Sequence, residues 1–143
     1  MEFVKLSTKE EILQVLKAFL YCFPHLTEKI SNLQEYANKL AEYSNFYVLK
    51  IEGEVAGMVS FYSNDRITFK GYISLIGVHS RYQKMGLGKR LIQETAEKMM
   101  ADQMRYMRIE VDRDNVNAQK FYAHLGFAKA EDKADSFYME RIL

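Results

Sequence analysis

Apolar residues recur every three or four positions in the first part of the chain, which predicts two amphipathic helices. The first is expected over residues 8–22, because Ser7 and Thr8 are each followed three positions later by a glutamate, at positions 10 and 11, a pattern typical of a helix start. Pro24 ends this helix, and Thr27 is expected to cap the second one, which ends near Tyr43. The residues predicted to face the core are Ile12, Val15, Leu16, Phe19 and Leu20, then Ile30, Leu33, Ala37 and Leu40.

Beyond Tyr43 the spacing changes to that of β-strands. Residues 46–51 and 55–61 are rich in β-branched and aromatic side chains, and the turn between them predicts a hairpin in which Gly53 takes a positive φ. Residues 71–79, GYISLIGVH, are apolar at successive positions, as in a central strand that is covered on both faces. We therefore predict this segment to be the most buried strand.

The second half of the chain predicts helices that alternate with strands. A helix over residues 88–102 precedes a strand over 106–111, and Asn115 is expected to cap a helix that Gly126 stops. Two final strands are expected over residues 127–130 and 136–142. The order β-α-α-β-β-β-α-β-α-β-β predicts an α/β or α+β fold with helices on both faces of a mixed sheet. The residues of the 88–102 helix predicted to face the core are Leu91, Ile92, Thr95, Ala96, Met99 and Met100.

Composition narrows the classes of protein that fit. With 143 residues, 48% of them hydrophobic, the chain is expected to form one domain over residues 1–143. The formal net charge of +1 gives no reason to expect a nucleic acid or an anionic membrane as partner. The longest apolar run, residues 19–23, is too short to cross a bilayer, and the N-terminus has no signal-peptide pattern. We therefore expect a cytoplasmic protein.

Metal ligands at a usable spacing are absent from the sequence. Cys22 and His25 are neighbours, but His79 and His124 stand apart, so no set of three or four ligands at zinc spacing exists. No metal site is predicted. Since Cys22 is the only cysteine, no intrachain disulfide is expected either.

A glycine-containing loop, residues 83–88 (QKMGLG), stands between the predicted 71–79 strand and the helix after it. Glycines let the backbone approach a ligand closely, and the free amides of a helix N-terminus favour anions such as phosphates. Lys84, Lys89 and Arg90 add positive charge. A dinucleotide fingerprint would need a small residue where Leu91 stands, and the glycine and hydroxyl positions of a nucleoside-triphosphate loop are not matched.

A second motif follows at residues 115–127, NVNAQKFYAHLGF. Together the two stretches resemble the GNAT superfamily, the Gcn5-related N-acetyltransferases, whose acetyl-CoA loop reads Gln/Arg-x-x-Gly-x-Gly/Ala. The resemblance implies the family's mixed, mostly antiparallel central sheet, acetyl-CoA as co-substrate, and transfer of acetyl to a primary amine. The matching residues are Gln83, Gly86 and Gly88 in the loop and Asn115, Ala118, Phe121, Tyr122, Gly126 and Phe127 in the second motif.

The resemblance also implies how the co-substrate is held. The strand ending at Val78 would splay from its neighbour and bind the pantetheine arm through its backbone, and amides of the loop would bind the pyrophosphate. A backbone amide near Val78 would stabilise the tetrahedral oxyanion. The cofactor-binding residues expected on this basis are Ile76, Gly77, Val78, Gln83, Lys84, Met85, Gly86, Leu87, Gly88, Lys89, Asn115, Ala118 and Tyr122.

Catalytic roles follow from the same resemblance. Tyr122 would protonate the departing CoA thiolate, and its neighbour Phe121 is expected in the core. A base is also needed, because a protonated amine cannot attack. Glu110 matches a glutamate that serves as base in the branch of the family that acetylates protein N-termini, and His79 and water are the alternatives.

The acceptor is the least specified part of the reaction. In this fold its pocket lies near the first helices and the hairpin loops, so the candidates are Tyr21, Phe23, His25, Tyr62, Asp65 and Arg66, each of which also suits an ordinary turn or core. The acceptor is expected to be a small molecule or a peptide with a free amine, and residues 136–142 offer a strand for a homodimer. The alternative functions are a CoA-binding sensor or regulatory module without turnover, and an interaction protein with no affinity for CoA.

Overall fold

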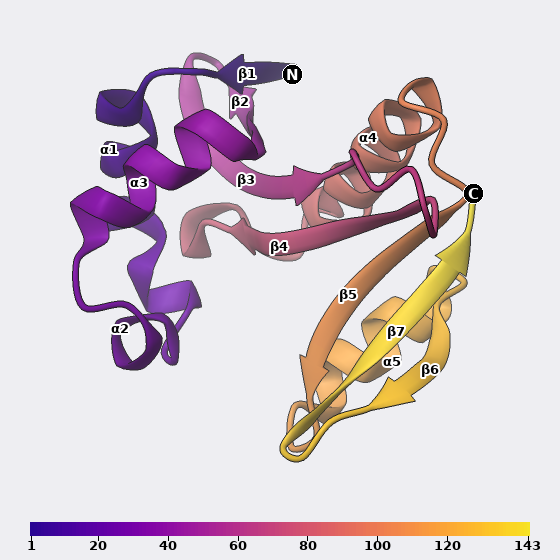
Figure 1. Cartoon of the computed structure of the whole chain (residues 1–143). Helices are drawn as coiled ribbons and strands as arrows, with labels where there is room; N and C mark the ends of the chain where they lie inside the picture. The colour runs from indigo at the N-terminus through magenta and orange to yellow at the C-terminus, as the bar shows by residue number, and fades with distance from the viewer. The chain divides into compact units, whose positions relative to one another are not determined.

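The computed structural model describes all residues, 1–143, and the chain divides into two compact units (Figure 1). The first consists of Met1–Phe61 and Leu75–Glu94, the second of Tyr62–Ser74 and Thr95–Leu143. Seven strands hydrogen-bond in the order β1-β2-β3-β4-β5-β7-β6. This confirms the predicted fold class of mixed helices and strands with a mostly antiparallel sheet.

Three antiparallel strands organise the first unit. β1 (Glu2–Leu6) pairs with β2 (Asn45–Ile51), and β2 pairs with β3 (Glu54–Tyr62). The β2–β3 turn has positive φ at Glu52 (50°) and Gly53 (80°), which suits the right-handed twist of a two-residue hairpin. The hairpin expected around Gly53 is therefore confirmed.

The helices of the first unit begin at side-chain caps. Thr8 accepts a hydrogen bond from the Glu11 amide at 3.3 Å and starts α1 (Lys9–Phe19), which continues into a 3₁₀ turn, η1 (Leu20–Cys22). The prediction that Thr27 caps a long second helix was wrong. Thr27 lies inside the four-residue α2 (Leu26–Lys29), the extended backbone at Ile30 interrupts the helix, and Asn32 caps a separate α3 (Leu33–Tyr43).

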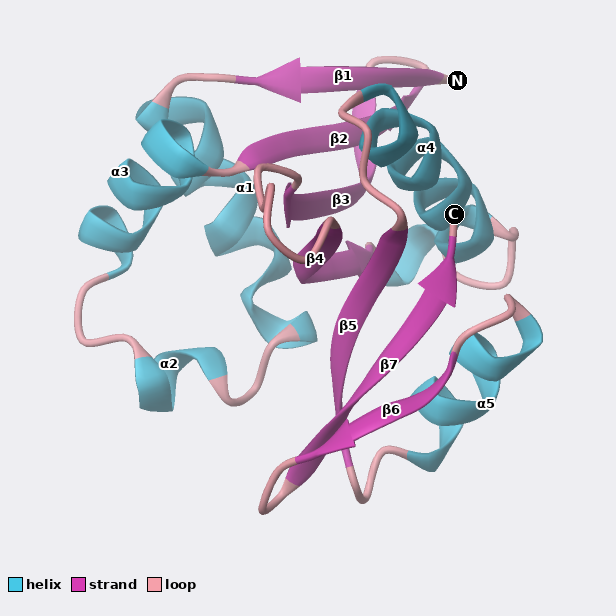
Figure 2. Ribbon diagram, turned by 45° about the vertical axis from the view of Figure 1, so that its right-hand side comes forward, coloured by secondary structure: helices cyan, strands magenta, loops and turns pink.

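Apolar side chains from α1, α3 and the strands form the core of this unit. α1 and α3 pack against each other, as Figure 2 shows. At Gly57 in β3 an added Cβ would lie 3.0 Å from Leu91 Cδ1, so the missing side chain lets the first half of α4 (Leu87–Ala101) pack closely on the strand. Fully buried members of the core are Ile12, Leu16, Phe19, Leu40, Phe46, Val48 and Met58.

The second unit is built on β5 (Tyr106–Asp112). The beginning of β4 (Lys70–Val78) pairs with it in parallel, and β7 (Ser136–Ile142) pairs with it antiparallel. β6 (Ala128–Asp132) completes the unit as an antiparallel neighbour of β7 (Figure 2). α5 (Val116–His124) connects β5 to β6 and begins at Asn115, whose side chain accepts a hydrogen bond from the Ala118 amide at 3.2 Å, as predicted.

Three burial predictions were wrong. β3 is more continuously buried than β4, because residues 56–61 are all buried whereas buried and half-buried positions alternate along most of β4. Met100 is 49% exposed and Phe121 is 37% exposed. Successive helical residues point about 100° apart, so Met99 and Tyr122 take the inward positions and their neighbours point outward.

No helix has both the length and the apolar character needed to cross a membrane.

Candidate active site

The carboxyl end of β4 carries the predicted residues Ile76, Gly77 and Val78, all half-buried. A Cβ at Gly77 would lie 3.3 Å from Phe23 Cζ and 3.5 Å from Cys22 Sγ, so glycine permits η1 and the chain after it to approach this strand closely. The carbonyl of Val78 lies 3.9 Å from Cys22 Sγ and accepts a 3.5 Å hydrogen bond from Gln83 Nε2. The strand end and the start of the loop are thus connected directly.

The loop itself is exposed and contains two left-handed residues. Lys84 has φ 65° and Gly86 has φ 76°, and α4 begins at the next residue. Leu87 is buried and fixes the helix start, and the first turn of α4 contains no acidic residue. The helix N-terminus therefore presents free amides and the positive end of its dipole without a competing carboxylate, which suits an anion.

A 3₁₀ turn, η2 (Ser80–Tyr82), connects β4 to this loop, and a polar network surrounds it. Glu54 Oε2 accepts a hydrogen bond from Tyr82 Oη at 2.5 Å and one from Arg81 Nη1 at 3.1 Å. The hydrogen bond from Tyr82, followed by the charge of Arg81, lowers the pKa of the Glu54 carboxyl, and the same hydrogen bond raises the pKa of the Tyr82 phenol. The Ser80 amide donates to Tyr21 Oη at 2.8 Å.

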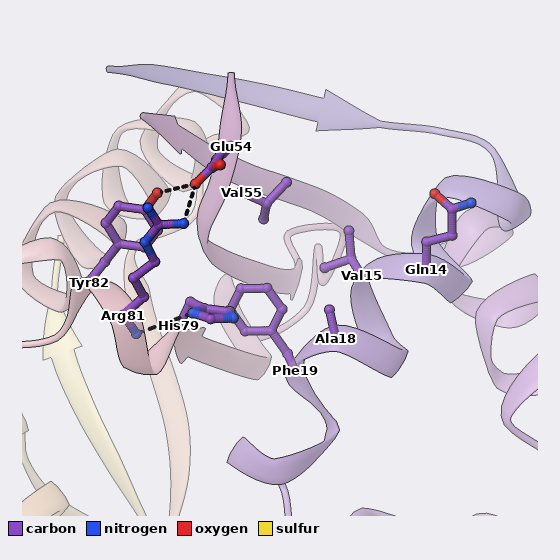
Figure 3. Close-up of a pocket in the computed structure, with 9 residues that line it drawn as sticks. All are labelled: Gln14, Val15, Ala18, Phe19, Glu54, Val55, His79, Arg81 and Tyr82. Carbon is purple, nitrogen blue, oxygen red and sulfur yellow. Dashed lines mark hydrogen bonds and ion pairs between the residues drawn. The ribbon is translucent and has the colours of Figure 1, made fainter. Parts of the chain in front are cut away.

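A pocket of about 350 Å³ lies between this network and α1. Figure 3 shows Glu54, Arg81 and Tyr82 grouped on one side of it, and Val15 and Ala18 of α1 on the other. His79 stands beside Phe19, with a ring-centroid separation of 5.7 Å, and its Nδ1 accepts the Arg81 amide hydrogen at 3.2 Å. The complete lining is Gln14, Val15, Ala18, Phe19, Glu54, Val55, His79, Arg81 and Tyr82.

Tyr122 of the second unit is 8% exposed. Its ring makes edge contacts with the rings of Phe121 and Phe127, with centroid separations of 5.2 and 5.5 Å. Burial among these rings raises the pKa of the Tyr122 phenol to about 12, because the charged phenolate would lose its hydration. The phenol therefore remains protonated throughout the neutral pH range.

Glu110 lies on β5 in the second unit. Its Oε2 accepts a hydrogen bond from Ser136 Oγ at 2.5 Å and lies 3.5 Å from Lys133 Nζ. Its side chain is about three-quarters buried. A carboxylate with one donor and one nearby cation keeps a free oxygen, Oε1, which is the atom available to take a proton.

Most residues considered for the acceptor have structural partners in their own unit. Asp65 caps its own turn, accepting hydrogen bonds from the Ile67 amide at 2.9 Å and the Thr68 amide at 3.0 Å; hydrogen bonds from Thr68 lower its pKa. Arg66 Nη1 donates to the Asp102 carbonyl at 2.7 Å. His25 lies 3.4 Å from Glu28 Oε2. These contacts favour the reading of these positions as ordinary turns.

The predicted site residues fall into two groups. The first unit contains Ile76 to Val78, the loop 83–89 and His79; the second contains Glu110, Asn115, Ala118 and Tyr122. Nowhere do three or more His, Cys, Asp or Glu side chains gather as a metal would require.

The sequence did not indicate the network of Glu54, Arg81 and Tyr82. The available signal was the hairpin, which returns the chain at Glu54 toward the end of β4, where the His79 amide donates to the Ala56 carbonyl at 2.8 Å.

Comparisons with known proteins identify the family of the chain. Residues 10–127 match the Acetyltransferase (GNAT) family. The chain is similar to the 5-NmdU N-acetyltransferase of Pseudomonas phage PaMx11, with 30% identity over 122 residues that cover 85% of this chain and 81% of the phage protein. It shares its fold with the IAA acetyltransferase of Bacillus cereus (TM-score 0.77, 18% identity, 99% of both chains). It also shares its fold with a GNAT family acetyltransferase from Elizabethkingia anophelis with acetyl-CoA bound (TM-score 0.75, 15% identity, 99% and 97% of the two chains). The chain therefore belongs to the GNAT acetyltransferase family.

Proposed function

We propose that this chain is an acetyl-CoA-dependent N-acetyltransferase whose single domain, residues 1–143, transfers acetyl directly to the primary amine of a small molecule or peptide. The observation that carries the proposal is the exposed loop before α4, with Gly86 in the left-handed region and no acidic residue in the first helical turn. Membership of the family supports this assignment, and so does the acetyl-CoA bound to the structurally similar protein from Elizabethkingia anophelis.

The residues present fit the co-substrate in chemical type. Amides of residues 83–89 would bind the pyrophosphate, with Lys84 and Lys89 contributing positive charge. Backbone groups of Ile76, Gly77 and Val78 would pair with the amides of the pantetheine arm, in the way that an added strand pairs with a sheet edge. Asn115 and Ala118, at the start of α5, would orient the arm.

The reaction would proceed without an acyl-enzyme. The amine nitrogen would attack the thioester carbonyl, so that a C–N bond forms and the C=O π electrons move to oxygen; the amine proton passes to a base, and collapse of this tetrahedral oxyanion re-forms the C=O bond and breaks the C–S bond. A backbone amide near Val78 would stabilise the oxyanion. The sulfur leaves as thiolate and gains a proton to become free CoA.

The raised pKa of Tyr122 refines its role in this step. A phenol with a pKa of about 12 is a poor proton donor to a thiol whose ordinary pKa is ~8.5, since complete transfer would cost about 5 kcal/mol. A hydrogen bond from the phenol to the developing thiolate avoids this free-energy cost, because the proton stays on the phenol oxygen. We therefore assign Tyr122 as a hydrogen-bond donor that stabilises the leaving sulfur, with the final proton supplied by the amine or by solvent.

Glu110 is the proposed base, with His79 and water as alternatives. Its carboxylate is held in place by Ser136 Oγ and lies near Lys133 Nζ, and both contacts are made through Oε2. His79 Nδ1 accepts the Arg81 amide hydrogen, so the neutral ring carries its own proton on Nε2 and would have to release the Arg81 amide before Nδ1 could take a proton. The E110Q substitution described in the Discussion tests whether Glu110 is the base.

Thermal unfolding with and without saturating acetyl-CoA tests the function, with NAD and ATP as controls. A ligand at ~100 times its dissociation constant adds about 2.7 kcal/mol, which raises the midpoint by several degrees in a protein of this size. CoA release is then measured with a panel of amines that includes 5-NmdU. Binding without turnover would identify a CoA-binding sensor instead, and no shift with acetyl-CoA would reject the co-substrate site.

A further inference from the structure

Glu54 stands 28 residues before Tyr82 in the sequence, yet it contacts both side chains that end the η2 turn. One carboxylate oxygen accepts hydrogen bonds from Tyr82 Oη and Arg81 Nη1, at 2.5 and 3.1 Å. Glu54 belongs to β3, a strand anchored in the core of the first unit by the six buried residues 56–61. Glu54 therefore connects the buried strand β3 to the exposed η2 turn.

Burial alone does not hold the turn and the loop. Of residues 80–86, all but Tyr82 are exposed. On the α1 side the turn faces the pocket of about 350 Å³ rather than closely packed side chains. Two further hydrogen bonds are made by amides of the turn. The Ser80 amide donates to Tyr21 Oη, and the Arg81 amide donates to the nearby His79 Nδ1. Since Lys84 must also adopt a left-handed φ of 65°, the loop conformation depends on how firmly the turn before it is held.

We propose that Glu54 is a positioning residue for acetyl-CoA: through Tyr82 and Arg81 it holds the η2 turn, and so keeps the 83–86 loop in the conformation whose amides receive the pyrophosphate. This role rests on the proposed function. Glu54 does not touch the co-substrate in this scheme. Its negative charge is offset by Arg81 and by the phenol of Tyr82, so that a carboxylate can stand beside an anion site without repelling the anion.

Substitution of Glu54 separates positioning from simple electrostatics, because the two effects have opposite signs. Removal of a negative charge near an anion site would strengthen acetyl-CoA binding if charge were the main effect. Loss of the hydrogen bonds that position the η2 turn would instead weaken acetyl-CoA binding. The Glu54 side chain is 57% exposed, so its truncation opens no cavity and the fold is retained.

The experiment compares E54A, E54Q and Y82F with two control variants, E42Q and Y43F. The controls change an exposed glutamate and an exposed tyrosine at the end of α3, in the same unit. We expect E54A and Y82F to raise both the dissociation constant and the KM of acetyl-CoA by about 2- to 5-fold, a range set by the modest strength of exposed polar pairs. The kcat value stays within about twofold. E54Q keeps an acceptor for Tyr82 and should lie between wild type and E54A.

Two further readouts complete the test. The double variant E54A/Y82F should bind acetyl-CoA no more weakly than E54A alone, because both changes break the same connection. Amide hydrogen exchange of residues 80–86, measured without ligand, should be faster in E54A and Y82F and unchanged in Y43F. This second readout does not depend on activity.

The outcomes distinguish this proposal from the function on which it rests. A wild-type protein without affinity for acetyl-CoA overturns both. A wild type that binds acetyl-CoA, with E54A binding equally or more tightly, overturns only the positioning role. Unchanged exchange of residues 80–86 in both E54A and Y82F would also overturn it, since the turn would then be held by other contacts.

Discussion

Replacement of Tyr122 by phenylalanine removes one oxygen atom and keeps the ring that contacts Phe121 and Phe127. At pH 7 the variant should therefore be about as stable as wild type. Turnover should nevertheless fall by about 10- to 100-fold, since the lost interaction is a hydrogen bond to a developing negative charge, worth about 1.5–3 kcal/mol. The KM for acetyl-CoA should change little, because the thiolate exists only in and after the transition state.

The same substitution has a second, independent signature at alkaline pH. An unfolded tyrosine ionises near pH ~10, whereas the pKa of Tyr122 in the folded protein is raised to about 12. Between these values the unfolded state has released a proton that the folded state still holds, so the free energy of unfolding falls as pH rises. The loss amounts to about 1 kcal/mol at pH 11 and approaches about 3 kcal/mol above pH 12. In Y122F this contribution is absent.

Urea denaturation of wild type and Y122F at pH 7 and at pH 11 measures this difference, and CoA release at pH 7 measures turnover. Y43F serves as the control, because Tyr43 is 61% exposed and its removal should leave the alkaline loss unchanged. An equal alkaline loss in wild type and Y122F would refute the burial argument. Undiminished turnover in Y122F would refute the role of Tyr122 at the leaving sulfur, whatever its pKa.

Three further substitutions test the other residues of the site. E110Q should lower kcat/KM by about 100-fold, because an amide cannot take the proton that a carboxylate accepts from the amine; an unchanged kcat/KM would point to His79 or water as the base. G86A should cost about 1 kcal/mol in urea denaturation and raise the KM for acetyl-CoA. The added Cβ meets nothing within 4 Å, so strain at φ 76° is its only effect, and a stability equal to wild type would contradict this. N115A loses the hydrogen bond from the Ala118 amide and should cost about 1 kcal/mol by the same assay; no loss would show that the helix needs no side-chain cap.

Local features were predicted well from the sequence because their causes are local. The cap at Thr8, the left-handed Gly53 in the hairpin and the cap at Asn115 each depend on a few neighbouring residues. The Thr27 prediction was wrong for a related reason. Two acceptable caps, Thr27 and Asn32, lie close together, and the backbone at Ile30 decides between them.

Burial of particular side chains was predicted less well. Apolar character placed Phe121 and Met100 in the core, but a helix has room for only one of two adjacent residues on its buried face. The 71–79 segment is apolar on both faces and was therefore predicted to be the most buried strand. In the structure β3 is the more continuously buried of the two. These outcomes depend on which neighbours cover each face, and neighbours distant in sequence supply that cover.

The sequence by itself determined the family, since the two motifs that carry it are short, contiguous runs whose spacing is visible in the letters. It also determined most of the order of helices and strands through hydrophobic periodicity, but not the break that separates α2 from α3. Only the tertiary structure decided which residues contact the η2 turn before the loop. Glu54 meets Tyr82 and Arg81 because antiparallel pairing returns the chain to the end of β4, and a contact across 28 residues leaves no local pattern. The raised pKa of Tyr122 has the same origin, since it depends on the packing around the ring and not on the residues beside it in sequence alone.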